Sequence, residues 1–171
     1  MPHIEPLDRA AITDPELLAL MARAEALGVP DDLFTRILAR VPGYAKVLLN
    51  ALLVSHGQGN VDHRLKEIIR IQLARFAGDS YFSALRSKVA LGAGLGEDDI
   101  DAGCGDYDDD PRFTEAEKVA LRYADQMYLD PQKVDKAFYD QLRQHYSEEE
   151  IVELGAFIGF NIGYHTFFGT L

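Results

Sequence analysis

The sequence predicts an all-α fold: one bundle of about eight or nine helices. No segment of the 171 residues shows the alternation of apolar and polar residues that marks a half-buried strand. Apolar residues instead recur at intervals of three and four, which places them on one face of a helix. Signals that start helices are frequent. Asp14-Pro15 combines an N-cap with an N1 proline, and 114–117 and 147–150 form capping boxes.

The chain divides into a short arm and one domain. Residues 1–13, which include two prolines, are expected to form an extended arm, and residues 14–171 a single domain. The first helices of the domain are expected at 14–28, 31–40 and 42–56. The third of these is apolar on nearly all sides, so we expect it at the centre of the bundle.

Residues 62–94 form the segment around which the other helices are expected to pack. They predict two helices joined by a turn at Ala77-Gly78, with Asp62 and Asp79 as N-caps. We call this pair of helices the core hairpin. Its expected buried side chains are Leu65, Ile68, Ile69, Leu73 and Phe76 in the first helix, and Phe82, Leu85, Val89 and Ala90 in the second.

The remainder of the chain predicts a short acidic helix at 96–102, a loop at 103–111 and three longer helices up to the C-terminus. The acidic run at 106–110 offers oxygen ligands for a hard cation. It lacks the Glu-terminated twelve-residue calcium pattern, so we expect a solvated loop and no metal site.

Composition excludes several classes of partner. The net charge of −11 and the pI near 4.8 argue against nucleic acid and anionic membrane surfaces. No apolar run is long enough to span a bilayer, and the first ten residues lack the features of a signal peptide. The single cysteine, Cys104, cannot form an internal disulfide, which fits a reducing cytoplasm, and it has no basic neighbour to activate it. Motifs for dinucleotides, ATP or zinc are absent, so no cofactor is expected.

Two charged residues stand out in the core hairpin. Glu67 lies close to the apolar stripe of the first helix, and Arg86 lies close to that of the second. A carboxylate and a guanidinium near a helix–helix core are costly unless they are paired or used. Either both reach the surface or pair with each other, or they belong to a functional site.

The same residues carry a resemblance to a known family. Glu67, the turn at 77–78, the segment 79–82 and Arg86 resemble the core hairpin of the carboxymuconolactone decarboxylase and alkyl hydroperoxidase D-like superfamily, and 92–100 resembles the continuation after it. The resemblance implies an AhpD-like helical bundle that forms homo-oligomers, typically trimers or hexamers. In the peroxidase branch of that family, the hairpin carries a Glu, a C-x-x-C pair and a His.

This chain departs from the peroxidase pattern. Asp79 stands at the first Cys position, Phe82 at the second and Tyr81 between them, while Arg86 replaces the His. Without a thiolate and a resolving thiol, the chain is not expected to be a C-x-x-C peroxidase. Asp79 is either simply the N-cap of the second helix, or a general base or electrostatic anchor for a substrate.

The C-terminal segment, GFNIGYHTFFGTL, is unusually rich in aromatic residues. Asn161 and His165 lie four residues apart and therefore on one helix face. Either this helix closes an oligomer interface, or Asn161, Tyr164 and His165 line an aromatic pocket beside Glu67 and Arg86.

Two hypotheses of function follow. The first is a cofactor-independent lyase, decarboxylase or isomerase acting on a small, carboxylated, ring-derived metabolite, as in the catabolism of aromatic compounds. Arg86 would bind the carboxylate, Glu67 or His165 would move a proton, and Tyr81 would donate to a developing oxyanion. The residues expected to contact the substrate are Asp79, Phe82, Asn161, Tyr164 and His56. The alternative is a redox-inactive binding or scaffold protein with the same fold.

Overall fold

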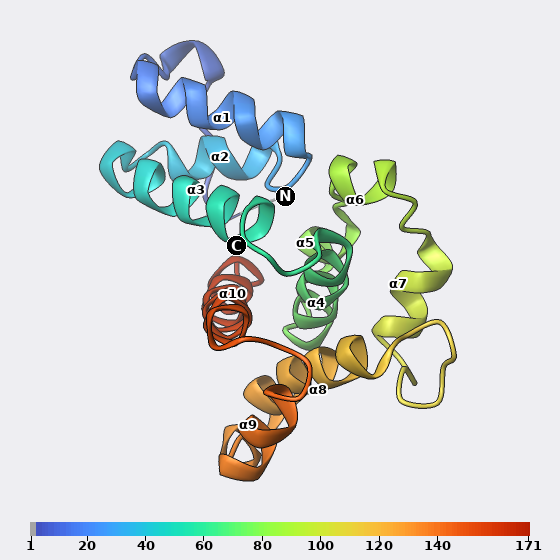
Figure 1. Cartoon of the computed structure of the whole chain (residues 1–171). Helices are drawn as coiled ribbons and strands as arrows, with labels where there is room; N and C mark the ends of the chain where they lie inside the picture. The colour runs from blue at the N-terminus through green and yellow to red at the C-terminus, as the bar shows by residue number, and fades with distance from the viewer. Residues whose placement is uncertain (1–2) are drawn as a thin grey trace.

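The computed structural model describes residues 3–171 and confirms the all-α prediction; these residues contain no strand (Figure 1). Within the same range, no helix combines the length and the apolar character needed to cross a membrane. The elements in chain order are η1 Arg9–Ala11, α1 Pro15–Leu27, α2 Asp32–Leu38, α3 Pro42–Gly57, α4 His63–Phe76, α5 Ser80–Ala84, α6 Lys88–Gly92, α7 Glu97–Gly103, α8 Glu115–Leu129, η2 Pro131–Lys133, α9 Lys136–Leu142 and α10 Glu148–Phe168.

The predicted caps form at the starts of these helices. Asp14, Asp31 and Asp62 accept hydrogen bonds from backbone N–H groups in the first turns of α1, α2 and α4. Thr114 and Ser147 begin α8 and α10 in complete capping boxes. Each cap satisfies N–H groups that have no partner within the helix, which is why these short polar residues define where the helices begin.

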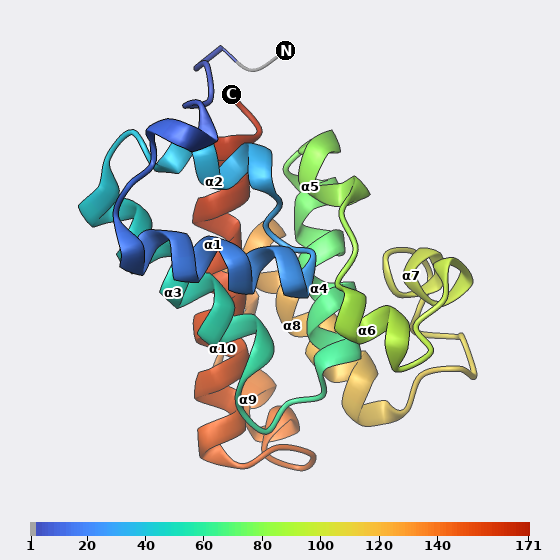
Figure 2. The same cartoon turned by 90° about the horizontal axis from the view of Figure 1, so that it is seen from above.

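The central helix is α4, and the prediction that α3 would be central is wrong. Ten of the fourteen residues of α4 are buried, and α4 packs against α8 and α10 as well as α5 and α7. In Figure 2, α4 and α10 run through the middle of the molecule while α3 lies beside them. Tyr44 and Val47 of α3 are 71% and 69% exposed. Apolar composition alone therefore did not identify the buried helix, because one apolar face of α3 meets solvent.

Two hydrophobic clusters meet along α4 and α10. One contains most of the buried side chains of α4, α8 and the first half of α10. The other contains those of α1, α2 and α3, together with Phe82 of α5 and Tyr164 near the end of α10. The residues that were predicted to be functional lie mainly where these two clusters adjoin.

The second helix of the core hairpin is broken in two, which the sequence did not predict. Leu85 adopts an extended conformation (φ −73°, ψ 150°) and ends α5. Ser87 then starts α6 by accepting a hydrogen bond from the N–H of Ala90. Because of this break, Val89 is 54% exposed instead of lying on a continuous buried face, and Arg86 lies in the connection between the two short helices.

The N-terminal arm packs against its own chain from residue 3 onward; residues 1–2 lie outside the described range. The side chains of Arg36 and Arg40 donate to the backbone oxygens of Leu7 and Glu5. The N–H of His3 donates to the backbone oxygen of Leu171 at 2.6 Å. The arm thereby joins α2 to the C-terminal residues that follow α10.

A buried lysine fixes the connection between α3 and α4. Lys66 is fully buried, and its ammonium group donates to the backbone oxygens of Ser55 and Gln58 at 2.9 and 2.7 Å. The same ammonium group forms an ion pair with Glu153 of α10. A buried charge of this kind is tolerable because all three of its hydrogen atoms have acceptors.

Candidate functional site

Glu67 is the centre of a buried charge cluster on α4. Its carboxylate is fully buried and receives a bidentate contact from Arg70, one turn along the same helix, at 2.8 and 2.9 Å. The N–H of Ser87 donates to it at 2.7 Å, and His56 Nε2 lies 3.0 Å away. The planar fork of arginine matches a carboxylate in this way, so the pair is strongly oriented.

Arg70 also explains the break in the core hairpin. Besides its contact with Glu67, its guanidinium donates to the backbone oxygens of Phe82 and Leu85, both at 2.7 Å. These two carbonyls belong to the end of α5, where helix hydrogen bonding stops. The segment from Phe82 to Ser87 therefore follows the buried ion pair rather than continuing as a helix, since each of these polar groups needs a partner.

The predicted convergence of Glu67 and Arg86 is not what the structure shows. Arg86 forms a bidentate contact with Glu97 at 2.8 Å for each nitrogen, and it also donates to the backbone oxygen of Leu85. That oxygen is the one that Arg70 contacts. Arg86 thus shares a backbone acceptor with Arg70, while its carboxylate partner is Glu97 and not Glu67. The guanidinium that meets Glu67 comes from its own helix and not from the second arm of the hairpin.

The protonation states of this cluster are fixed by burial and pairing. Burial opposes ionisation of Glu67, but the charge and hydrogen bonds of Arg70, with the contact from His56, outweigh it and hold the pKa of Glu67 far below its usual range. Burial lowers the pKa of His56 to about 4, although the neighbouring Glu67 partly opposes this change. At neutral pH the cluster therefore consists of a carboxylate, a guanidinium and a neutral imidazole.

Two further residues support His56 from outside the predicted set. The ring of His63 stacks on that of His56 with centroids 4.4 Å apart. His63 Nδ1 lies 2.9 Å from the backbone oxygen of His56, and its Nε2 lies 2.7 Å from the hydroxyl of Ser87. This arrangement connects the end of α3 to the start of α6.

Asp79 and His165 form a second buried polar pair. Asp79 caps α5, because one carboxylate oxygen accepts from the N–H of Phe82 at 3.0 Å. The other carboxylate oxygen lies 3.0 Å from Nδ1 of His165, which is fully buried in α10. Burial lowers the pKa of His165, and the hydrogen bond that His165 donates to Asp79 only partly opposes this change. A neutral His165 therefore donates from Nδ1 to Asp79.

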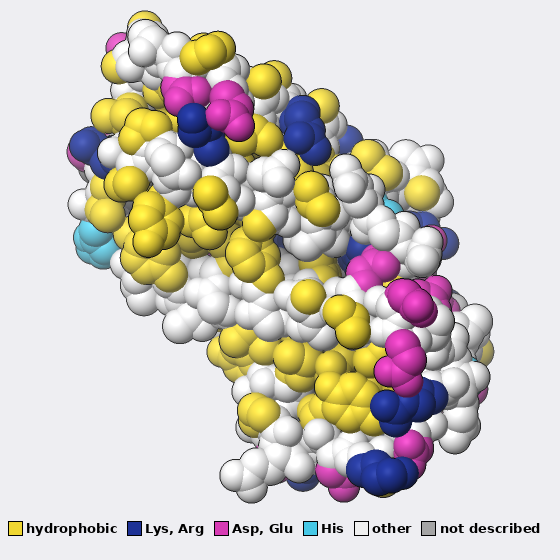
Figure 3. Space-filling view, turned by 60° about the vertical axis from the view of Figure 1, so that its left-hand side comes forward, with side chains coloured by type: hydrophobic (Ala, Val, Ile, Leu, Met, Phe, Trp, Pro, Cys, Tyr) yellow, Lys and Arg dark blue, Asp and Glu magenta, His cyan; other side chains and the backbone are white. Residues whose placement is uncertain are grey.

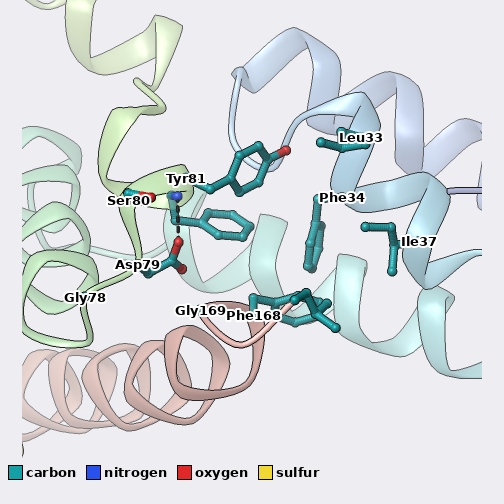
Figure 4. Close-up of a pocket in the computed structure, with 11 residues that line it drawn as sticks. Leu33, Phe34, Ile37, Gly78, Asp79, Ser80, Tyr81, Phe168 and Gly169 are labelled. Atoms are coloured by element: carbon teal, nitrogen blue, oxygen red, sulfur yellow. Dashed lines mark hydrogen bonds between the residues drawn. The ribbon is translucent and has the colours of Figure 1, made fainter. Parts of the chain in front are cut away.

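A pocket of about 390 Å³ opens beside Asp79. We call it the outer pocket. Figure 4 shows Leu33, Phe34 and Ile37 of α2 on one side, Asp79 and Tyr81 on the other, and Phe168 at the end of α10. The complete lining is Leu33, Phe34, Ile37, Gly78, Asp79, Ser80, Tyr81, Phe82, Phe168, Gly169 and Leu171.

The aromatic walls of the outer pocket are packed edge to face. The ring centroid of Phe34 lies 5.1 Å from that of Phe82 and 4.2 Å from that of Phe168. The hydroxyl of Tyr81 donates to Asp31, the cap of α2, so that α2 and α5 are joined across the pocket. Burial and this carboxylate raise the pKa of Tyr81 far above its usual value. The result is a slot for a flat ring with the side-chain carboxylate of Asp79 in its wall.

A much smaller inner cavity, of about 10 Å³, lies behind Phe82. His56, Asn161 and Tyr164 line it together with Arg70. The amide of Asn161 donates to the backbone oxygen of Phe157 at 2.8 Å. Phe82 lines this cavity as well as the outer pocket. The predicted site residues thus fall into two neighbouring spaces rather than one.

The structure places the predicted residues as follows. Asp79, Tyr81 and Phe82 line the outer pocket; His56, Asn161 and Tyr164 line the inner cavity; Glu67 lies beside the latter; His165 lies behind Asp79; and Arg86 lies apart with Glu97. Sequence reasoning missed Arg70, Ser87, Phe34 and Phe168. Arg70 was detectable, because it follows Glu67 by three residues and therefore shares its helix face.

Cys104 and the acidic loop do not form a reactive or metal-binding centre in the part of the chain that is described. Burial raises the pKa of the Cys104 thiol to about 11, so the thiol stays protonated at neutral pH. In the loop, Asp108 pairs with Arg122 and Asp110 with Arg112. Residues 3–171 contain no group of three or more His, Cys, Asp or Glu side chains arranged to hold a metal ion.

The fold is similar to that of solved structures of a debrominase. The apo structure of the debrominase Bmp8 matches with a TM-score of 0.76 and 22% sequence identity, over 95% of this chain and 86% of that one. A cysteine-to-alanine variant of Bmp8 in complex with 2,3,4-tribromopyrrole matches with a TM-score of 0.77 and 22% identity, over 96% and 87% of the two chains. No protein-family model and no curated protein sequence matches the chain. At this level of identity, the comparison shows that the chain shares the helical fold of Bmp8.

Proposed function

We propose that the protein is a small-molecule enzyme of the carboxymuconolactone decarboxylase-like superfamily, which binds a flat ring in the outer pocket and transfers a proton by means of Asp79. The observation that carries the proposal is the buried Asp79–His165 pair in the wall of an aromatic pocket. The reaction class is that of a lyase or an isomerase working without a cofactor, since acid–base chemistry of this kind needs only positioned side chains.

The lining of the outer pocket supports a narrower class of substrate than the one proposed from the sequence. None of its eleven lining residues is Lys or Arg, and its one charged side chain is Asp79. The predicted carboxylate group on the substrate has no cationic partner here, because Arg86 is engaged by Glu97. A carboxylate in an apolar slot instead favours a ring that carries an N–H or O–H donor. We therefore propose a neutral or cationic ring with such a donor.

Asp79 is suited to accept a proton from that ring. Each of its carboxylate oxygens already accepts one hydrogen bond, from the N–H of Phe82 and from His165. Each oxygen therefore retains a lone pair for a ligand. His165 acts here as a positioning residue, since it holds the carboxylate at a fixed angle and lies outside the pocket lining. The aromatic walls would hold the ring in one plane against this carboxylate, which is the geometry that proton transfer requires.

The solved structures support the proposed type of ligand and not a particular reaction. Bmp8 was solved with 2,3,4-tribromopyrrole, a small flat ring, in a protein of the same fold. The ligand-bound form of Bmp8 is a cysteine-to-alanine variant, whereas the outer pocket of this chain has no cysteine in its lining. Because burial also keeps Cys104 protonated, we propose chemistry that does not use a thiolate.

A matched pair of ring compounds tests this proposal. Indole and benzofuran have nearly the same shape, but only indole has an N–H that Asp79 can accept. We expect indole to bind about tenfold more tightly, equivalent to about 1.4 kcal/mol. The Asp79→Asn variant should lose this preference while it keeps the helix cap. Methyl NMR titration of Leu33 and Ile37 measures both affinities. Equal binding of the two rings to the wild type would contradict the assigned role of Asp79.

The alternative function is a binding protein that has no turnover. It predicts the same ligand preference but no product after long incubation with bound rings, as followed by mass spectrometry.

Both functions are compatible with the predicted homo-oligomer, which stays a proposal. It is supported by exposed apolar side chains on α3 and α10, namely Tyr44, Val47, Val54, Val152 and Phe167. Figure 3 shows hydrophobic side chains spread over one face of the molecule. Sedimentation of the purified chain tests this expectation.

A further inference from the structure

The inner cavity behind Phe82 is small and partly polar. Its apolar walls come from α3, α10 and the loop that precedes α2, and its polar wall comes from His56, Arg70, Asn161 and Tyr164. At about 10 Å³ it is close to the least space that holds one water-sized group. A hydroxyl or a carbonyl oxygen has similar dimensions.

Two polar atoms at this cavity have no hydrogen-bond partner within the described residues. The hydroxyl of Tyr164 has none, although Tyr164 is only 6% exposed. His56 Nε2 lies 3.0 Å from a carboxylate oxygen of Glu67, but its orientation forms no hydrogen bond there. Leaving such groups unpaired in the interior costs about 1–3 kcal/mol each. The neighbouring amide of Asn161, by contrast, already has the backbone oxygen of Phe157 as its acceptor.

Phe82 separates this cavity from the outer pocket. Its ring is buried and lines both spaces. The centroid of the Phe82 ring lies 5.1 Å from that of Phe34, which lines the outer pocket. It lies 4.8 Å from that of Tyr164, which lines the inner cavity. The backbone of Phe82 is held by Asp79 and Arg70, so any opening between the two spaces would involve its side chain and not its main chain.

We propose that the two spaces form one binding site. A ring occupies the outer pocket, and the side chain of Phe82 turns aside. A single hydroxyl or keto oxygen of the ring then enters the inner cavity, where it pairs with Tyr164 and His56. This inference rests on the proposed function, because it requires that the outer pocket holds a ring. It adds the class of substrate: a ring with an N–H or O–H donor at one edge and an oxygen substituent at another.

The charges around the cavity fit a neutral oxygen group. Burial raises the pKa of Tyr164 well above its usual value, so its hydroxyl stays protonated and can both donate and accept. Burial likewise keeps His56 neutral. Four of the five N–H donors of Arg70 are directed to Glu67 and to two backbone oxygens, and its charge is balanced by that of Glu67. An ionised carboxylate would be larger than the cavity and would have no counter-ion there.

Rings with and without a hydroxyl test this inference. Hydroxyindoles that carry the hydroxyl on the benzo ring are compared with indole by methyl NMR titration. At least one of them should bind the wild-type protein about tenfold more tightly than indole does. In Tyr164→Phe this preference should fall to within about twofold, while the affinity for indole stays the same. A preference that persists in Tyr164→Phe, or the absence of any preference, would overturn the inference.

The role of Phe82 is tested with a matched control. The apparent affinity for a hydroxyindole is the intrinsic affinity multiplied by the fraction of molecules in which the inner cavity is open. Phe82→Leu should therefore increase the ratio of hydroxyindole to indole affinity. Phe76→Leu, which changes a ring that packs on Tyr128 and lines neither space, should leave that ratio unchanged. An unchanged ratio in Phe82→Leu would contradict the role of Phe82 as the wall between the outer pocket and the inner cavity.

The outcomes for the inference and for the proposed function differ. Indole binding with no gain from a hydroxyl leaves the proposed function intact and removes only the inner site. A gain that depends on Tyr164, without any preference for indole over benzofuran, supports the inner site and removes the role of Asp79. If no ring binds at all, both are wrong.

Discussion

The buried Glu67–Arg70 pair and the buried Asp79–His165 pair contain similar groups but differ in what surrounds them. The carboxylate of Glu67 has partners on both oxygens from Arg70 and Ser87, and it lines neither of the two spaces. The carboxylate of Asp79 has one partner on each oxygen and lines a pocket of about 390 Å³. Burial and perturbed ionisation are common to both regions. Access to a ligand distinguishes them.

The two buried pairs therefore have different roles. The Glu67 cluster determines the path of the backbone, because Arg70 takes the carbonyl oxygens at the end of α5. That path in turn places Asp79 and Phe82 at the outer pocket. We therefore expect changes at Glu67 or Arg70 to act mainly on stability, and changes at Asp79 to act mainly on ligand binding and turnover.

The largest expected effect is that of Arg70→Met. This change leaves the carboxylate of Glu67 buried without its counter-ion, which should lower the free energy of unfolding by about 3–5 kcal/mol. Arg86→Met is the matched control, since it removes a partly exposed pair with Glu97 and should cost at most about 1 kcal/mol. Urea unfolding followed by circular dichroism measures both values. Similar losses in the two variants would remove the distinction between the buried cluster and the surface pair.

The second effect is a dependence of stability on pH. The folded pKa of His56 is about 4, below the ordinary value of 6.5, so between these values the unfolded chain binds a proton that the folded chain does not. The free energy of unfolding should therefore fall by up to about 3 kcal/mol as the pH decreases from 6.5 to 4. His56→Gln should reduce this slope, and the part that remains belongs to His165, whose pKa burial also lowers. His145→Gln, which changes an exposed histidine, should leave it as in the wild type.

The third effect separates function from stability. Asp79→Asn retains an N-cap for α5 but loses the charge that accepts a proton. Turnover of any substrate that the wild type converts should fall about 100-fold, while the free energy of unfolding changes by about 1 kcal/mol or less. Steady-state kinetics and urea unfolding on the same preparation give both numbers. A large loss of stability with normal turnover would assign Asp79 to the scaffold instead.

The smallest expected effect is an increase in stability. Tyr164→Phe removes a buried hydroxyl that has no partner among the described residues, and the ring packing with Phe34 and Phe82 remains. The free energy of unfolding should rise by about 1 kcal/mol. Phe34→Leu, which loses ring contacts in the same cluster, should lower it. Thermal unfolding of the ligand-free variants checks the sign, and a loss in Tyr164→Phe would show that its hydroxyl already has a partner in solution.

The sequence predicted the helices better than the side-chain pairings. Caps such as Asp14 and Ser147 act within a few residues, so their effect can be recognised locally. The outer pocket joins α2, the start of α5 and the end of α10, which are distant in sequence. Helical period does not determine how such elements meet. The break after α5 depends on Arg70 of another helix, and Arg86 left the expected helix for the same reason.

The short contact between the two ends of the chain has a practical consequence for the experiments above. His3 is hydrogen-bonded to Leu171, and Leu171 belongs to the lining of the outer pocket. An affinity tag attached after Leu171 would therefore begin beside the outer pocket and compete with ligands for it. Purification for ligand titrations should use a cleavable tag, and apparent affinities should be compared before and after its removal.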